Sequence, residues 1–360
     1  MQRSILWAAL ILGLAGLAAT IAGGPASAQV QTVRVGWCAK TVSSAAAPFA
    51  IATKLGWFEK DGIKVELVPL PGSTDCVKLV ATKELHVSLP SVEPLAIIRP
   101  QGVKGKFFYT AYQANIYGIA VPAESSIKSV TDLKGKKIGV ISMASGGVIV
   151  ARALVKAAGL NPDSDVSIVV AGEAAQTAAL VNSKQVDALS QFDTQYAMTN
   201  SAGAKLRLLD HPEIKKFPSN GFMALEDYLA NNRKQAVALG RGYAKGTVFA
   251  IANPEAAIRI LWEVFPQTKA TGKDEKTALR DDLITLEARA RNWRYEQVDG
   301  KRWGENVMVN YQAYLDWLLA QGIIKAKTDA NDIVTNDLLD EIDNFDEPAV
   351  IAEAKAYKAK

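Results

Sequence analysis

The chain has 360 residues, of which 49% are hydrophobic and 22% charged, and its formal net charge is +4. Lysine and arginine are dispersed among aspartate and glutamate, without a basic stripe that carries interleaved aromatic residues, so the sequence does not predict a nucleic-acid-binding protein. The length exceeds what one hydrophobic core comfortably fills, which predicts two lobes.

Residues 1–28 have the features of a secretory signal peptide. Arg3 provides a positive start, residues 5–21 form an apolar run, and residues 26–28 read Ala-Ser-Ala, a small-residue cleavage motif. A membrane anchor is the alternative, but the run is marginal for a span and the cleavage motif follows it directly. We therefore expect a mature chain that begins at Gln29, has no membrane span and is exported to a bacterial periplasm.

Strand and helix patterns alternate along the rest of the chain. The first part predicts helices over 48–60 and after Thr74 and Ser91, and strands over 33–36, 63–67, 87–89, 107–111 and 117–121. The second part predicts helices over 148–158, 174–182 and 193–202, and strands over 137–141, 166–170, 188–190, 206–209 and 221–224. Helical patterns then follow over 230–252, 254–265, 275–290 and 303–321, and Pro348 opens a last helix. This alternation predicts an α/β fold with mostly parallel sheets.

Two stretches about a hundred residues apart repeat one outline. Residues of the same type recur at offsets of 100 to 103, namely Gly36 with Gly139, Gly56 with Gly159, Gly72 with Gly172, and Lys83 with Lys184. We interpret the repeat as a duplicated α/β unit that forms two facing lobes with a crevice for a small molecule. Polar segments at 122–136 and 212–220 predict two crossings, with lobe 1 formed by residues 29–121 and 222–360 and lobe 2 by residues 122–221.

Candidate binding residues lie in the loops that follow the strands, because ligands of open parallel sheets bind beyond the carboxyl ends of the strands. Polar candidates, several at helix starts that suit an anion, are Ser43, Ser44, Ser73, Thr74, Ser91, Ser142, Ser145, Gly146 and Gln191. Candidate apolar walls are Trp37, Tyr117, Phe192 and Phe222, and candidate hydrogen-bond acceptors are Glu93 and Asp193. Helix capping, core packing and complementing of the helix dipole are the alternative roles of these residues.

The two cysteines, Cys38 and Cys76, lie at the end of the first strand and the start of a helix, so they share one edge of the predicted sheet. A disulfide is geometrically possible there, and two small buried apolar side chains are the alternative. Catalytic and metal-binding motifs are absent from the sequence, whose two histidines are His86 and His211. We therefore expect neither an enzyme nor a cofactor.

Three segments resemble one family. Residues 48–67, PFAIATKLGWFEKDGIKVEL, resemble the opening of periplasmic solute-binding proteins of ABC importers, in the SsuA/TauA/NMT1-THI5-like group. Residues 130–140, VTDLKGKKIGV, are similar to the family's entry into the second lobe. Residues 186–194 look like a further family segment, with Phe192 and Thr194 in place of its Trp and Pro. The resemblance covers roughly residues 30–265, and the helical part after about residue 270 adds no information on the ligand.

The resemblance implies a type II periplasmic-binding-protein fold, with two Rossmann-like lobes joined by a two-strand hinge and, here, extra C-terminal helices. It implies delivery of a small molecule to an ABC permease with a separate ATPase, and we expect a monomer. Our first hypothesis for the ligand is a small organic anion, an aromatic carboxylate or sulfonate. The alternatives are a neutral pyrimidine-like heterocycle stacked on Trp37 or Phe192, a THI5-like pyrimidine synthase, and an exported sensor module.

Overall fold

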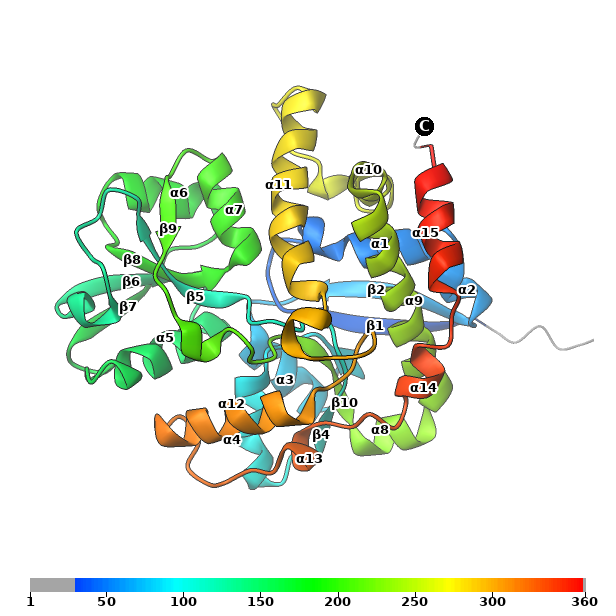
Figure 1. Ribbon diagram of the computed structural model, residues 1–360, viewed down its shortest axis with the longest axis horizontal. Helices are drawn as coiled ribbons and strands as arrows, with labels where there is room; N and C mark the ends of the chain where they lie inside the picture. The colour runs from blue at the N-terminus through cyan, green and yellow to red at the C-terminus, as the bar shows by residue number, and fades with distance from the viewer. Residues whose placement is uncertain (1–29, 359–360) are drawn as a thin grey trace, which may run out of the picture.

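The computed structural model describes residues 30–358, so the predicted signal peptide lies outside the described residues. Two α/β lobes lie side by side, with the second lobe in green on the left of Figure 1. Across residues 30–358, no helix combines the length and the apolar character needed to cross a bilayer.

The sheet of the first lobe has the strand order β2-β1-β3-β10-β4. Its strands are β1 (Gln31–Trp37), β2 (Ile63–Pro69), β3 (Val87–Ser88), β4 (Gly105–Thr110) and β10 (Gly221–Leu225). Strand β1 runs parallel to β2 and β3, whereas β10 runs antiparallel to β3 and β4. The helices between these strands are α1 (Ala47–Lys54), α2 (Trp57–Lys60), α3 (Ser73–Ala81) and α4 (Val92–Ile98).

The sheet of the second lobe has the order β7-β6-β8-β5-β9. Its strands are β5 (Tyr117–Pro122), β6 (Lys136–Val140), β7 (Val166–Val170), β8 (Ala188–Phe192) and β9 (Leu206–Leu208). Its helices are α5 (Gly146–Ala157), α6 (Ala174–Asn182) and α7 (Asp193–Ser201). The Ser145 hydroxyl caps α5 by accepting from the Gly147 N–H at 3.1 Å.

The two sheets repeat one topology, since β2-β1-β3-β10-β4 corresponds element by element to β7-β6-β8-β5-β9. The repeat extends to backbone conformation, because Lys83 and Lys184 both adopt positive φ angles, of 63° and 57°. Gly36 and Gly139 are both needed for close packing: a Cβ on either residue would lie 2.8 Å from the Cβ of Ser88 or Ala171. The prediction of a duplicated α/β unit and the predicted fold class are therefore confirmed.

The chain crosses between the lobes earlier than the sequence predicts. Strand β5 pairs with β8 and β9, so it belongs to the second sheet and the crossing precedes it, at residues 111–116. The boundary placed between residues 121 and 122 therefore falls one strand late, because the apolar pattern of β5 does not reveal which sheet it joins. Residues 209–220 form the return crossing, which includes a short 3-10 helix at Pro212–Ile214, and neither crossing is a strand.

Glycine residues change the extent of two of the predicted helices. The helix predicted over residues 48–60 is divided into α1 and α2, because Gly56 adopts a left-handed conformation with a φ of 69°. The helix predicted over residues 303–321 begins only at Met308, because Gly304 has a φ of 81° and its carbonyl accepts from the Thr110 N–H. In both cases a glycine at positive φ ends or delays the helix.

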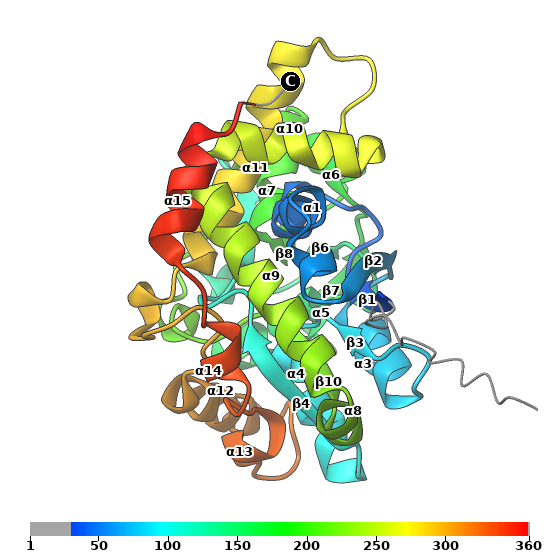
Figure 2. The ribbon, with the colours of Figure 1, turned by 90° about the vertical axis from the view of Figure 1, so that its right-hand side faces the viewer.

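The C-terminal part of the chain is helical and packs mainly on the first lobe. Its helices are α8 (Glu226–Asn231), α9 (Arg233–Ala252), α10 (Pro254–Val264), α11 (Glu275–Trp293), α12 (Met308–Ala320), α13 (Ala330–Ile333), α14 (Leu339–Ile342) and α15 (Glu347–Ala356). Helix α9 packs against α1 and α15, as Figure 2 shows. Helix α11 differs from the others because it also packs on α7 of the second lobe, so it bridges the two lobes.

Candidate functional site

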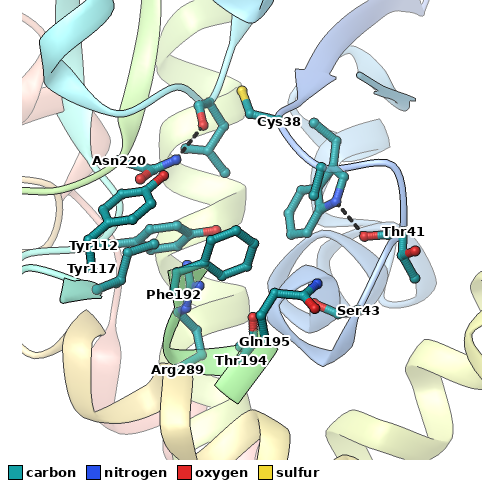
Figure 3. A pocket seen from close by; sticks show the side chains of 14 residues that line it. Cys38, Thr41, Ser43, Tyr112, Tyr117, Phe192, Thr194, Gln195, Asn220 and Arg289 are labelled. Atoms are coloured by element: carbon teal, nitrogen blue, oxygen red, sulfur yellow. Dashed lines mark hydrogen bonds between the residues drawn. The ribbon is translucent and has the colours of Figure 1, made fainter. Parts of the chain in front are cut away.

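A narrow cavity with a volume of about 30 Å³, open to solvent, lies where the two lobes and both crossings meet. The lining side chains come from the first lobe, the crossings, the second lobe and α11, in that order: Trp37, Cys38, Ala39, Thr41, Ser43, Leu89, Tyr112, Ile116, Asn220, Tyr117, Phe192, Thr194, Gln195 and Arg289. Figure 3 shows this arrangement from close by. Because the lining is shared by both lobes, a molecule bound there would contact both at once.

Aromatic rings form much of the cavity wall. Trp37, at the end of β1, is fixed by a hydrogen bond from its indole Nε1 to the Thr41 carbonyl at 3.0 Å. Tyr117 and Phe192 pack edge to face, with their ring centres 5.9 Å apart. These two residues are paired across β5 and β8, so the sheet register positions both rings. A hydrogen bond and the sheet register therefore position these rings, and the wall suits a flat apolar body.

A buried arginine supplies the charge at the cavity. Arg289 on α11 is only 2% exposed, and its guanidinium lies 3.7 Å from the centre of the Tyr112 ring. Its Nε donates to Asp193 Oδ2 at 3.0 Å, and its second amino group, Nη2, donates to Asp193 Oδ1 at 2.5 Å. The remaining group, Nη1, is buried without a hydrogen-bond partner among residues 30–358. The guanidinium of this lining residue thus has one amino group that no protein acceptor satisfies.

Asp193 holds the guanidinium from behind and does not line the cavity itself. Its carboxylate also accepts from the Asn292 side-chain amide at 2.9 Å and from the Thr194 N–H at 2.6 Å. Burial lowers the pKa of Arg289, but the neighbouring Asp193 carboxylate outweighs that effect and the pKa is raised above its usual value. Arg289 is therefore charged at any physiological pH.

The crossing segments hold α11 in place beside the cavity. The Asn292 carbonyl accepts from the backbone N–H groups of Gln113 and Ala114, at 2.8 and 3.3 Å. In the first half of α11, Asp282 accepts from the Ser44 hydroxyl at 3.1 Å and from the Trp262 indole at 2.8 Å. Helix α11 is thus attached both to the loop after β1 and to the crossing, which fixes Arg289 between them.

Several of the predicted serine and glycine residues lie instead where the two lobes touch. The Ser142 hydroxyl donates to the Pro71 carbonyl at 2.7 Å, and the Thr74 N–H donates to the Ala144 carbonyl at 3.0 Å. Gly72 allows this approach, because a Cβ there would overlap the Ala144 carbonyl and lie 2.6 Å from the Ser145 nitrogen. The described conformation is accordingly a closed one.

A buried polar cluster lies next to this contact. Glu93 at the start of α4 accepts from the Tyr314 hydroxyl, while its Oε2 and the Ser91 hydroxyl are buried and have no partner within the described chain. Burial raises the pKa of Glu93. The Ser73 hydroxyl accepts from the Ser91 N–H at 3.1 Å, and Gly146 packs against the Ser91 and Tyr117 hydroxyls.

The predicted candidates thus occupy different places. Those that line the cavity are Trp37, Ser43, Tyr117 and Phe192. Those at or beside the contact between lobes are Ser73, Thr74, Ser91, Glu93, Ser142, Ser145 and Gly146. The remaining four serve other elements: Ser44 bonds to α11, Gln191 donates to the Gly172 carbonyl within the second lobe, Phe222 packs in the core against Phe49 and Tyr243, and Asp193 pairs with Arg289.

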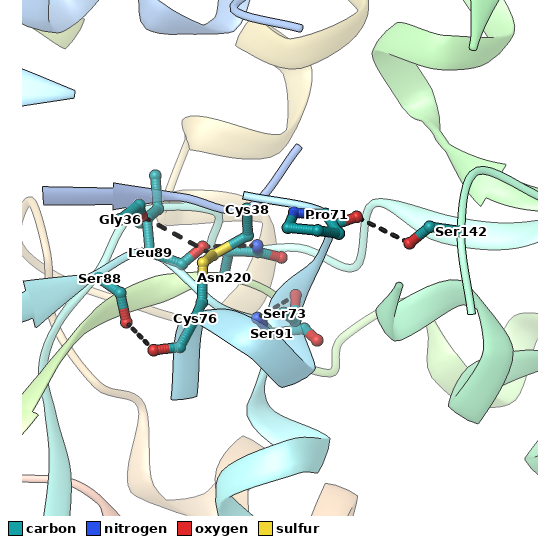
Figure 4. Close-up of a disulfide and its surroundings, with 10 residues drawn as sticks. All are labelled: Gly36, Cys38, Pro71, Ser73, Cys76, Ser88, Leu89, Ser91, Ser142 and Asn220. Carbon is teal, nitrogen blue, oxygen red and sulfur yellow. Dashed lines mark hydrogen bonds between the residues drawn. A yellow bond between two sulfur atoms is a disulfide. The ribbon is translucent and has the colours of Figure 1, made fainter. Parts of the chain in front are cut away.

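A disulfide joins Cys38 to Cys76, with the two Cα atoms 5.9 Å apart. Figure 4 shows that it links the loop after β1 to helix α3, at the shared sheet edge. Cys38 also lines the cavity, next to Trp37. The disulfide therefore fixes one wall of the cavity to the body of the first lobe.

Sequence reasoning misses the part of the site that comes from the crossings and α11. Tyr112, Asn220 and Arg289 line the cavity without having been predicted as ligand-binding residues, and so do Thr194 and Gln195 of α7. A signal for Arg289 exists in the sequence, because it lies three residues after Leu286 and four before Trp293, on the apolar face of α11. The expectation that the chain beyond residue 270 adds nothing about the ligand is thus at odds with the cavity lining.

The two similar sheets and the cavity between them define the periplasmic-binding-protein fold. Residues 43–257 match the NMT1/THI5-like family, and the chain belongs to that family. This confirms the resemblance found in the sequence. No three His, Cys, Asp or Glu side chains within the described residues are grouped so that they could hold a metal ion.

Relatives of this chain are named as binding proteins. The riboflavin-binding protein RibY of Chloroflexus aurantiacus is 22% identical over 300 residues, which cover 81% of this chain and 82% of the relative. A putative aliphatic sulfonates-binding protein of Bacillus subtilis is 32% identical over 143 residues, 38% of this chain and 41% of the relative. The fold is similar to that of the alkanesulfonate-binding protein SsuA from Xanthomonas axonopodis pv. citri bound to MOPS, with a TM-score of 0.62, 17% identity and coverage of 86% of this chain and 99% of that one.

Proposed function

We propose that this protein is an extracytoplasmic solute-binding protein that captures a small organic anion and delivers it to an ABC permease with a separate ATPase. The anion carries an aromatic or other flat apolar body and a carboxylate or sulfonate group. Residues 1–28 direct export to the periplasm in this proposal, and the mature chain acts as a monomer without catalysing a reaction.

One observation supports the anion above all others, namely the buried Nη1 of Arg289 at the cavity wall, which lacks a partner within residues 30–358. A buried donor without an acceptor costs roughly 1–3 kcal/mol, and more when it is charged. A carboxylate or sulfonate oxygen would satisfy it with a strong, charge-assisted hydrogen bond. The Thr194 hydroxyl, which is also buried, unpaired in the described chain and at the cavity wall, is a second donor for the same group.

The names of two of the similar proteins agree with this ligand class. SsuA of Xanthomonas was solved with MOPS, which is a sulfonate, and the Bacillus subtilis relative is named for aliphatic sulfonates. The aromatic wall formed by Trp37, Tyr117 and Phe192 favours a ring over an alkyl chain, because stacking and edge contacts add about 0.5–1.5 kcal/mol beyond the area buried.

A neutral heterocycle is the second candidate, and one observation favours it. Asp193 already balances the charge of Arg289, so a carbonyl oxygen of a pyrimidine-like ring could accept from Nη1 without bringing a further charge into a buried site. The relative from Chloroflexus aurantiacus is named for a neutral-ring ligand, riboflavin. The two candidates differ in one property, the charge of the group that meets Arg289.

Pairs of probes that differ in charge but have nearly the same shape distinguish the anion from the neutral heterocycle as the ligand class. Benzoate is compared with benzamide, benzenesulfonate with benzenesulfonamide, and uracil represents the heterocycles, each by thermal shift and by isothermal titration calorimetry. We expect the anions to stabilise the protein, by about 2.7 kcal/mol at a hundredfold excess over Kd. Stabilisation by the amides or uracil but not by the anions would replace the first candidate with the second.

The role of Arg289 requires a variant that leaves no unpaired charge. Arg289→Met alone leaves Asp193 as an unpaired buried charge, which destabilises the folded protein by roughly 3–5 kcal/mol whether or not a ligand binds. The double variant Arg289→Met with Asp193→Asn removes both charges, so we expect it to unfold near the wild-type temperature and still fail to bind anions. If the double variant binds benzenesulfonate as tightly as the wild type does, Arg289 does not take part in recognising the anion.

A further inference from the structure

We propose that Asp193 selects the charge of the ligand: by pairing with Arg289 from behind the cavity, it makes the site accept a group with one negative charge and reject a group with two. This inference rests on the proposed function, since it concerns the same cavity. It gives Asp193 a role different from that of a ligand acceptor, which the sequence suggested.

The hydrogen bonds of Asp193 leave it no capacity for the ligand. Its Oδ1 accepts from Arg289 Nη2 at 2.5 Å and from the Thr194 N–H at 2.6 Å. Its Oδ2 accepts from Arg289 Nε at 3.0 Å and from the Asn292 amide at 2.9 Å. The carboxylate therefore affects the ligand only through its charge and through the position in which it holds the guanidinium.

The charge balance of the cavity follows from this arrangement. Within the part of the chain that the structure describes, Arg289 is the one lysine, arginine, aspartate or glutamate that lines the cavity, and Asp193 neutralises it. A monoanion at Nη1 shares the guanidinium with Asp193 and also meets the Thr194 hydroxyl. Because Asp193 already balances the guanidinium, its carboxylate repels each negative charge on the ligand, and a dianion meets about twice the repulsion that a monoanion does.

A series of three probes that share a phenyl ring and a tetrahedral group tests the effect of charge. Benzenesulfonamide, benzenesulfonate and phenyl phosphate carry a charge of about 0, −1 and −2 respectively at about pH 8, well above the second phosphate pKa of about 6, and phenyl phosphate has one additional oxygen between the ring and the tetrahedral group. Affinities are measured by calorimetry at one fixed ionic strength. We expect the wild type to bind the sulfonate at least about tenfold more tightly than the phosphate, a difference of about 1.4 kcal/mol.

Two variants separate the charge of Asp193 from its positioning of Arg289. Asp193→Asn removes the charge and keeps the shape, so we expect the preference for sulfonate over phosphate to shrink by about tenfold or to reverse. Asn292→Ala removes the hydrogen bond from Asn292 to Asp193 without changing any charge, so it should alter both affinities by the same factor. An unchanged ratio in a folded Asp193→Asn variant that still binds the sulfonate would overturn the inference.

A second variant and the wild-type affinities cover the other outcomes. If Asp193→Asn does not fold, Asn292→Asp carries the test, because it adds a negative charge beside the pair and should widen the preference for the sulfonate. An unchanged ratio in that variant would count against the inference. If the wild type binds neither anion, the proposed function fails. If it binds both anions equally and the ratio stays constant in the variants, the proposed function stands and only the charge selection fails.

Discussion

Removal of the Cys38–Cys76 disulfide should reduce the stability of the first lobe more than any single surface change. The double variant Cys38→Ser with Cys76→Ser deletes the bond without leaving a reactive thiol. The two cysteines are 38 residues apart, and a crosslink that closes a loop of that length restricts the unfolded chain by about 4 kcal/mol. At roughly 2 °C per kcal/mol for a large domain, the unfolding temperature should fall by about 8 °C.

Two spectroscopic signals show which lobe loses stability. Every tryptophan of the described chain lies outside residues 117–208, so tryptophan fluorescence follows the first lobe and the C-terminal helices, whereas circular dichroism follows both lobes. We expect the fluorescence transition in urea to move to lower concentration, and wild-type protein unfolded in a reductant to match the variant. A loss below about 1 kcal/mol in both experiments would refute the loop-closure argument.

The disulfide should also affect the ligand. Cys38 lines the cavity beside Trp37, so release of the loop after β1 should weaken binding of benzenesulfonate as well as stability. Unchanged affinity in the folded serine variant would show that the other lining groups position the ligand without this constraint.

Three further predictions concern closure and pH. Gly72→Ala places a Cβ against the backbone of residues 144 and 145, so it should hold the lobes apart, raise the radius of gyration in X-ray scattering and weaken ligand binding. The control Gly36→Ala clashes within the first lobe and should cost about 1–3 kcal/mol of stability without opening the lobes. Burial raises the pKa of Glu93, so the folded state binds more protons than the unfolded state and stability falls as the pH rises above the ordinary glutamate range. Glu93→Gln should therefore be more stable than the wild type at about pH 7, with the difference lost near about pH 4. A gain in stability that does not vary with pH would contradict this cause. Burial lowers the pKa of His211, whose Nε2 accepts from the Ile119 N–H at 3.3 Å. The folded imidazole therefore binds fewer protons than the unfolded one, so stability should decrease as the pH falls below about 6.5. His211→Gln should flatten that decrease in thermal unfolding measured from about pH 7 to about pH 5.

The amino-acid sequence by itself determines the duplicated unit, the fold class and the family. Gly36 and Gly139 can be recognised from their spacing, because the same tight strand packing is needed once in each lobe. Cys38 and Cys76 can be placed at one sheet edge, since the carboxyl ends of neighbouring parallel strands and the starts of the helices that follow them share that edge. These features follow from local periodicity and from a repeat within the chain.

The tertiary structure alone decides which candidates meet at the cavity. Phe222 and Phe192 are both aromatic residues of strands, yet the first packs in the core and the second lines the cavity. Arg289 meets Asp193 across 96 residues of sequence, and the helix that carries it has no counterpart in the repeat. Strand and helix patterns report which face of an element is apolar, but the partner of that face depends on how distant elements pack. For that reason the charge at the cavity, and the carboxylate that balances it, become visible only in the folded protein.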